Sequence, residues 1–266
     1  IIYEAQASAL SAGKRKINAP TYFSRLARTM ISWLSTATAE GVLYPVDVRL
    51  RPEGKAGSIA TSLDRLETYF KHDAWIWEKL ALSKARCIAG DACLAQKLEA
   101  SIQKTVNQPH DQSKIGPALK SMLFRIRESR NANSEWHLRA RDGGLIDLGL
   151  LIQAMRLQHG DLFSNTGQSP KDILETLFSS GKISEPQFSE LQVANNLFDE
   201  LHQCIRLTFG NAAALKADLP TPLKEFVLTQ MDLADSRQLN ILLNESIYQV
   251  QKQIDDYLMI NTDRSA

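Results

Sequence analysis

The chain has 266 residues, of which 44% are hydrophobic and 23% charged, and its formal net charge is +1; this length suffices for one large or two modest domains. The nearly neutral charge argues against a broad electrostatic surface for nucleic acid. Three cysteines without Cys-x-x-Cys spacing indicate neither a zinc site nor a disulfide framework, and no apolar run approaches the roughly 20 residues that cross a bilayer, so we expect a soluble cytoplasmic chain that binds no membrane.

The first 35 residues predict a strand, a loop and a helix. Ile1-Ile2-Tyr3 is typical of the end of a buried strand. Residues 6–16, rich in alanine, serine, glycine and lysine, predict a loop. Asn18 suits an N-cap and Pro20 the first helical turn. Apolar residues at helical spacing then predict an amphipathic helix to about Ser35.

A second strand is predicted over residues 42–51, where apolar and polar side chains alternate. Pro52 ends this strand, and the glycines behind it loosen the backbone. One face of the strand is apolar, and the other carries Asp47, Arg49 and Arg51.

This arrangement suits a metal–phosphate site. Asp47 can hold Mg²⁺, and Arg49 and Arg51 can bind phosphate oxygens in bidentate fashion. Backbone N–H groups between Gly54 and Gly57 can also face a phosphate. The alternative is a solvated strand face on which Asp47 and its arginine neighbours neutralise one another.

Further helices are predicted downstream. Thr61 and Asp64 resemble a capping box at the start of one helix. Asp73 can cap the next, which we expect to extend to about Ile88, and Gly90-Asp91 begins a third.

Glu78 lies among aromatic and apolar neighbours on the helix after Asp73, so its carboxylate is expected to be partly buried and to need a partner. Arg86, two turns further along, is one candidate, and Arg49 and Arg51 are others. We expect an ion pair that orients the site without taking part in the reaction.

The rest of the chain is almost wholly helical in pattern. Residues 107–114 are polar and contain a proline, which indicates a linker. The dense apolar run Leu145–Met155 predicts the central helix of a bundle. Further helices are predicted near residues 170–180, 184–205, 222–232 and 235–260. We therefore expect an α+β, predominantly α chain, with domains over residues 1–112 and 113–266.

Three sequence blocks resemble the family of glutamine synthetase adenylyltransferases. The first is Tyr-Pro-Val-Asp-Val-Arg-Leu-Arg-Pro at residues 44–52 with the Gly-Lys-Ala-Gly that follows at 54–57. The second is Ala-Trp-Ile-Trp-Glu-Lys-Leu-Ala-Leu at 74–82, and the third is Asp-Gly-Gly-Leu-Ile-Asp at 142–147. The resemblance covers about residues 1–160, and the Trp-x-Trp-Glu block resembles the half of the family enzyme that attaches AMP, usually its C-terminal half.

The resemblance implies transfer of AMP from ATP to a tyrosine of glutamine synthetase, with two Mg²⁺ ions, in the regulation of nitrogen metabolism. It implies a nucleotidyltransferase αβ core, incomplete at its N-terminal end in residues 1–112, followed by a helical bundle. Asp47 would be the third carboxylate of the site, and Arg49 and Arg51 would support the triphosphate. Glu78, Arg86 and Asp147 would hold the site residues in position without taking part in the reaction. A PII-type signalling protein and glutamine are the implied regulators.

The sequence departs from the family in two places. In the family a Gly-Ser-x-x-Asp-x-Asp motif, whose aspartates bind the catalytic metals, directly precedes a strand like Ile1-Ile2-Tyr3. These residues contain no Asp-x-Asp, so we expect a fragment that is inactive on its own. In the third block Gly149 stands where a glutamate is usual. Gly149 either permits a close contact between helices or shows that the role of the missing acid is taken by another residue or lost. The alternative role of Asp147 is that of an acid at the start of a helix, where it interacts with the helix dipole.

Two other functions stay open. The helical region from about residue 113 is a candidate regulatory or docking module for glutamine synthetase or a PII-type protein. The chain could also belong to the half that removes AMP, against which the Trp-x-Trp-Glu block argues, or to a relative that modifies a PII-type protein.

Overall fold

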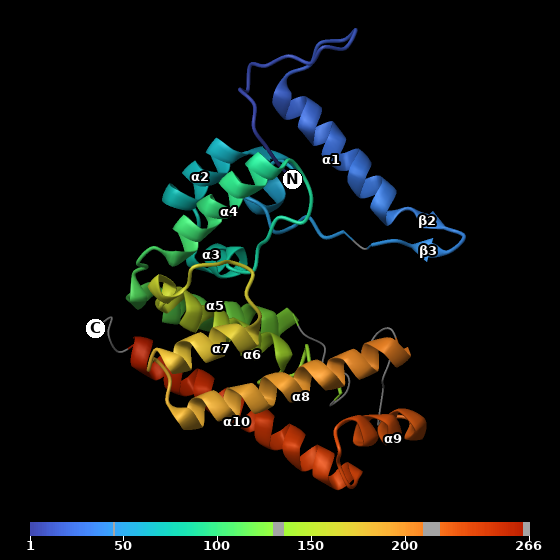
Figure 1. Cartoon of the computed structure of the whole chain (residues 1–266), viewed down its shortest axis with the longest axis vertical. Coiled ribbons are helices and arrows are strands. Elements are labelled where there is room, and N and C mark those ends of the chain that lie inside the picture. Colours follow the sequence, from blue (N-terminus) through green and yellow to red (C-terminus); the bar gives the residue numbers. More distant parts are fainter. Residues whose placement is uncertain (45, 130–135, 210–218, 263–266) are drawn as a thin grey trace. The chain divides into compact units, whose positions relative to one another are not determined.

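The computed structural model describes residues 1–44, 46–129, 136–209 and 219–262, and is mostly helical with two small sheets (Figure 1). The predicted α+β, predominantly α fold class is confirmed. The chain divides into two compact units, Ile1–Val106 (the first unit) and Asn107–Ala266 (the second unit). The assignment of a nucleotidyltransferase domain to residues 1–112 and a bundle domain to residues 113–266 stays a prediction. In the described ranges no helix combines the length and hydrophobicity needed to cross a bilayer.

The first unit begins with the predicted strand. β1 (Ile2–Tyr3) pairs in parallel with β4 (Thr61–Ser62). The long helix α1 (Ala19–Ser35) follows, and the Asn18 side chain accepts the Thr21 N–H at 3.0 Å, so the predicted N-cap is confirmed.

Two apolar clusters hold the first unit together. One joins α1 to the strands through Tyr3, Ala19, Ala27 and Ala60, and the Tyr3 and Phe23 rings stack there at 4.2 Å. The other surrounds α2 (Leu63–His72), where Leu63, Leu66 and Phe70 pack against residues of α3 (Ile76–Leu82) and α4 (Ala92–Asn107).

The predicted strand over residues 42–51 is wrong. β2 (Ala37–Thr38) and β3 (Gly41–Val42) form a short antiparallel hairpin, and beyond Val42 the described residues run to Arg51 without pairing to another strand. The backbone groups are bonded locally instead. The N–H of Tyr44 donates to the carbonyl oxygen of Leu34, and the N–H of Arg49 donates to the Asp47 carboxylate. Burial still alternates over residues 46–49, with Val46 and Val48 half-buried and Asp47 and Arg49 exposed, because an extended chain keeps its period of two with or without a partner. Leu50, at the end of the predicted strand, is exposed instead.

Three predicted helix boundaries also change. The N-cap of α3 is Trp75, whereas Asp73, which was predicted to cap this helix, is the C-cap of α2. Ser62, not Thr61, caps α2, since its hydroxyl accepts the Arg65 N–H at 3.3 Å while Thr61 belongs to β4. The helix expected to extend to Ile88 ends at Leu82, where the buried Ser83 hydroxyl donates to the Leu80 carbonyl oxygen at 2.7 Å.

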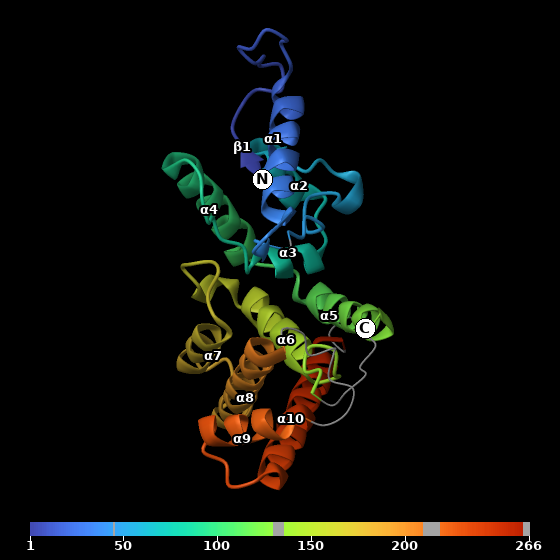
Figure 2. The same cartoon turned by 90° about the vertical axis from the view of Figure 1, so that its right-hand side faces the viewer.

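The second unit is a bundle of helices around α6 (Leu145–Gln158), which is buried on nearly all sides. Figure 2 shows this helix among its neighbours α5 (Gln112–Ser129), α7 (Pro170–Ser179), α8 (Glu185–Phe209) and α10 (Ser236–Thr262), all of which contact it. α9 (Thr221–Gln230) packs on α8 and α10. The central helix and the later helices are confirmed, and Ser169 caps α7 as its sequence indicates.

Candidate active site

A cavity of about 420 Å³ lies within the first unit. Its apolar wall includes Ile1, Ile2, Leu66, Phe70 and Trp77. Four basic side chains also line it, from Arg49, Arg51, Lys84 and Arg86, together with a single acid, Glu78. Such a mixture of an apolar wall with a few charged groups is typical of small-molecule sites.

The cavity gathers four of the residues singled out from the sequence, namely Arg49, Arg51, Glu78 and Arg86. Asp47, Gly54 and Gly57 are not part of its lining, although all three belong to the segment that leads to it. Asp147 lies in the second unit. The sequence prediction missed Lys84 and Tyr69, because loop and helix packing, with no local motif, determines where these side chains point.

Asp47 forms a bidentate ion pair with Arg49. The Nη2 of Arg49 lies 2.7 Å from Oδ2, its Nε lies 3.0 Å from both carboxylate oxygens, and its backbone N–H donates to Oδ1 at 2.9 Å. The pair is solvent-accessible, with 55% of the Asp47 side chain exposed. This geometry is the neutralised pair that the sequence left open as the alternative to a metal–phosphate site.

The Asp47 carboxyl is therefore expected to titrate unusually low. Hydrogen bonds from the Arg49 side chain, and then from its backbone, lower the pKa of Asp47 to about 2. Because the folded-state pKa is depressed, the pair contributes stability above the ordinary carboxyl pKa and loses it as the pH falls toward 2. Carbon-13 NMR titration should give this value. In Arg49→Gln the pKa should rise toward the ordinary range, and an unchanged value would contradict the pairing.

Arg51 organises the loop that follows. Its guanidinium group donates to the backbone carbonyl oxygens of Val48, Lys55 and Gly57. A Cβ on Gly57 would lie 2.0 Å from the Pro52 carbonyl oxygen, and Gly54 has a φ of +54° in the left-handed region. Both glycines thus fit a tight turn rather than loosening one.

The N–H groups of this turn are bonded within it. Gly54 donates to the Arg51 carbonyl oxygen at 2.9 Å, and Gly57 donates to that of Gly54 at 3.2 Å. Phosphate binding by these two glycines stays a prediction, and it requires the turn to exchange internal bonds for bonds to the ligand.

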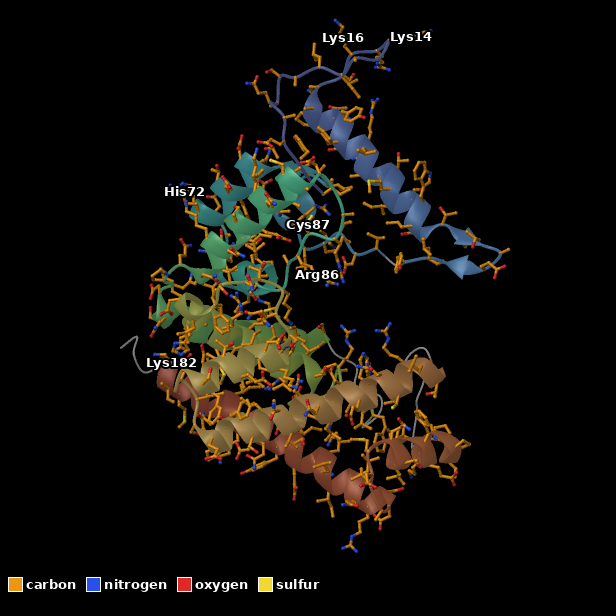
Figure 3. All side chains as sticks on the ribbon, viewed as in Figure 1. Lys14, Lys16, His72, Arg86, Cys87 and Lys182 are labelled. Carbon is orange, nitrogen blue, oxygen red and sulfur yellow. The ribbon has the colours of Figure 1, made fainter. Side chains whose placement is uncertain are left out.

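Glu78 is buried, as expected, but the arginine partner predicted for it is wrong. The Tyr69 hydroxyl donates to both carboxylate oxygens, at 2.7 and 2.9 Å, and the Trp75 N–H donates to Oε2 at 2.9 Å. Glu78 therefore accepts the N–H of the N-cap residue Trp75 at the start of α3 and also lines the cavity. Arg86 lies beyond the end of α3, in an irregular and exposed segment that Figure 3 labels, because the helix that would have carried it stops at Leu82.

Removing the Tyr69 hydroxyl should destabilise the first unit. Tyr69→Phe leaves the buried Glu78 carboxylate short of a donor, and such losses amount to about 1–3 kcal/mol. Burial, and then the bond to Glu78, raises the pKa of Tyr69, so its contribution is present below the ordinary tyrosine pKa and is lost as the pH rises through the folded-state value. Urea denaturation measures the effect. Tyr22→Phe, at a ring that is 45% exposed, is the matched control and should change stability by less than about 0.5 kcal/mol; equal effects would contradict the assigned role.

Asp147 is fully buried and closes the turn before α6. Its Oδ2 accepts the Gly143 N–H at 2.9 Å and lies 3.3 Å from Nη2 of Arg127 on α5. Arg127 also reaches Asp142 at 3.4 Å. These contacts give the Asp-Gly-Gly-x-x-Asp block a structural purpose within the second unit.

The acids brought together in the described ranges do not form a metal site by themselves. No three histidine, cysteine, aspartate or glutamate side chains gather there to hold a metal ion, and both oxygens of Asp47 are bonded to Arg49. That Asp47 contributes one ligand to a Mg²⁺ site stays a proposal, and this site would need further acids.

Residues 1–101 match the model of the glutamate-ammonia ligase adenylyltransferase family. Similar proteins include the bifunctional glutamine synthetase adenylyltransferase/adenylyl-removing enzymes of three bacteria. That of Bartonella quintana is 33% identical over 96% of this chain and 26% of its own length, and that of Mesorhizobium japonicum has the same values. That of Chromobacterium violaceum is 34% identical over 77% of this chain and 23% of its own length. The chain thus spans about a quarter of the length of these relatives.

Proposed function

We propose, because residues 1–101 match the model of the glutamate-ammonia ligase adenylyltransferase family and the chain is similar to part of the bifunctional enzymes, that it is the ATP-binding part of an enzyme that transfers AMP to a tyrosine of glutamine synthetase. The observation that carries this proposal is the cavity of the first unit, with four basic side chains and an apolar wall.

The cavity suits a nucleotide in both size and character. Its volume of about 420 Å³ lies within the range of about 300–1,000 Å³ found for small-molecule sites. Trp77 and Phe70 offer flat apolar surfaces to a base, and Arg49 and Arg86 offer guanidinium forks that match phosphate oxygens.

In this proposal Arg49 exchanges partners when ATP binds. Water screens an exposed ion pair and leaves it weak, so a multiply charged triphosphate can draw Arg49 away from Asp47. The released carboxylate regains a pKa closer to the ordinary range and becomes a better proton acceptor.

Transfer is a displacement at the α-phosphorus of ATP. The tyrosine oxygen forms a bond to the α-phosphorus, the bond from that phosphorus to the oxygen bridging toward the β-phosphorus breaks, and pyrophosphate leaves. Asp47 takes the hydroxyl proton. Holding the two reactants in line supplies much of the rate.

The test is a calorimetric titration of the 266-residue chain with ATP, followed by an assay for labelled AMP on glutamine synthetase. We expect binding at one site without transfer, because within the described residues no further acids gather with Asp47 to hold metal ions. Absence of ATP binding would contradict the proposed function, and AMP transfer by this chain alone would contradict the expected dependence on further acids.

Removal of AMP is the second candidate, since the names of the relatives cover both reactions. The Trp75-x-Trp77-Glu78 block, which resembles the attaching half, favours attachment. Incubation of the complete enzyme carrying Asp47→Asn with unmodified and with adenylylated glutamine synthetase distinguishes the two, because only the reaction that this half performs should be lost.

A further inference from the structure

A continuous apolar stripe lies exposed along α1. Tyr22, Leu26, Met30 and Trp33 follow one another at spacings of four, four and three, which places them on one face of the helix. Their exposed fractions are 45%, 41%, 42% and 75%. A neighbouring face, with Ala19, Phe23 and Ala27, packs into the first unit, and the stripe is not part of that cluster.

The apolar surface continues past the end of the helix. Leu43 and Tyr44 are 65% and 61% exposed. The Tyr44 N–H donates to the Leu34 carbonyl oxygen at 3.0 Å, and the Ser35 hydroxyl donates to the Tyr44 carbonyl oxygen at 3.4 Å. These bonds fix the segment beside the C-terminal end of α1.

Basic side chains gather at the other end. Between Glu4 and Glu40 the sequence contains no acid and five basic residues, Lys14, Arg15, Lys16, Arg25 and Arg28, so the remainder of the chain has a net charge of −4 against a total of +1. Lys14 and Lys16 are exposed and lie at the tip of a loop that the bridge between Leu10 and Asn18 joins to the start of α1 (Figure 3). The surface thus grades from positive at one end to apolar at the other.

We propose that this face of α1 is the docking surface for an acidic segment of the protein substrate, with its acids toward Lys14 and Lys16 and its apolar side chains on the stripe. The proposal rests on the proposed function, and charge complementarity selects the partner. Tyr44 is three residues from Asp47, a reach of at most about 11 Å of chain. A segment docked on the stripe can therefore present a hydroxyl to Asp47.

The gradient favours a protein over an anionic membrane. Helices that lie on membranes carry basic side chains along both flanks of the apolar face, so that all of them meet the headgroups at one depth. Here three of the five basic residues gather beyond one end of the helix, and Leu43 and Tyr44 extend the apolar part at the other. A partner segment with acidic residues at one end and apolar residues at the other matches this arrangement. An anionic membrane, whose charge is uniform along the helix, does not.

Binding of purified, unmodified glutamine synthetase to the 266-residue chain tests the proposal by biolayer interferometry. Leu26→Glu/Trp33→Glu should weaken binding at least tenfold, and so should Lys14→Glu/Lys16→Glu. The matched control Ile241→Glu/Tyr248→Glu, at side chains of α10 that are 49% and 62% exposed, should bind as the parent chain does. Circular dichroism and ATP affinity, which depends on the separate cavity, should be unchanged in all variants.

Several outcomes overturn the docking surface. They are no binding by the parent chain, equal binding by the stripe variants, or weakening only by the α10 control, which would place docking on the second unit. The proposal also fails if the parent chain does not bind glutamine synthetase but uses the stripe for another purpose. That purpose could be binding to phosphatidylserine vesicles, or self-association detected by sedimentation. If ATP binding persists in these cases, the proposed function stands and only the docking surface fails; loss of ATP binding in the parent chain contradicts the proposed function instead.

Discussion

Gly144→Ala is expected to destabilise the second unit by about 3 kcal/mol or more, because overpacking against a rigid backbone is among the most severe single changes. A Cβ at this position would lie 2.1 Å from the Leu138 carbonyl oxygen and 2.9 Å from that of Arg141. Both atoms are backbone, and both already accept hydrogen bonds within the turn, from Leu145 and from Gly144 itself. The turn cannot widen without losing the start of α6, around which the unit packs.

Thermal and urea denaturation followed by circular dichroism measure this effect. Gly13→Ala is the control, because its Cβ would meet only the Arg15 carbonyl oxygen at 4.0 Å, and it should change stability by no more than about 0.5 kcal/mol. A Gly144→Ala chain as stable as the control would contradict the packing described for the Asp-Gly-Gly block.

ATP affinity should fall by about 30-fold or more in Arg49→Gln/Arg86→Gln, because the loss of each guanidinium–phosphate contact at an exposed side chain should weaken binding by at least about sixfold. Each guanidinium group lines the cavity. Calorimetry with ATP gives the ratio of dissociation constants. Arg206→Gln, at an exposed side chain on α8 of the second unit, serves as the control and should bind ATP like the parent chain. Equal affinity in all three chains would exclude these arginines from the phosphate site.

The helices were predictable where local chemistry alone determines them. Asn18 and Ser169 cap their helices through side-chain bonds to residues only three positions away, and the apolar run of α6 is buried nearly all round, as a central helix requires. These features depend on residues that are close in sequence, so they can be predicted without knowledge of the tertiary structure.

The candidate site was less predictable because its partners come from packing. Alternation at Val46 and Val48 indicated an extended chain, but a strand also needs a second strand beside it, and no local pattern reports one. Burial of Glu78 followed from its apolar neighbours. Its partner did not, because Tyr69 on α2 reaches it through the packing of α2 against α3.

Serine at position 83 illustrates the same limit for Arg86. The spacing of Glu78, Leu82 and Arg86 suits one face of a longer helix, and the sequence continues without proline or glycine until Gly90. The helix nevertheless ends at Leu82, where the Ser83 hydroxyl bonds back to Leu80. Arg86 still lines the cavity, by way of an irregular segment that helical spacing cannot describe.

The most direct measurement for the nucleotide site follows the indole N–H signals of the tryptophans by NMR as ATP is added. Trp77 lines the cavity of the first unit, whereas Trp136 is buried in the second. A saturable shift of the Trp77 signal with Trp136 unmoved is the predicted result. If ATP leaves Trp77 unchanged, or shifts Trp136 alone, the first-unit cavity is not where this chain holds its nucleotide.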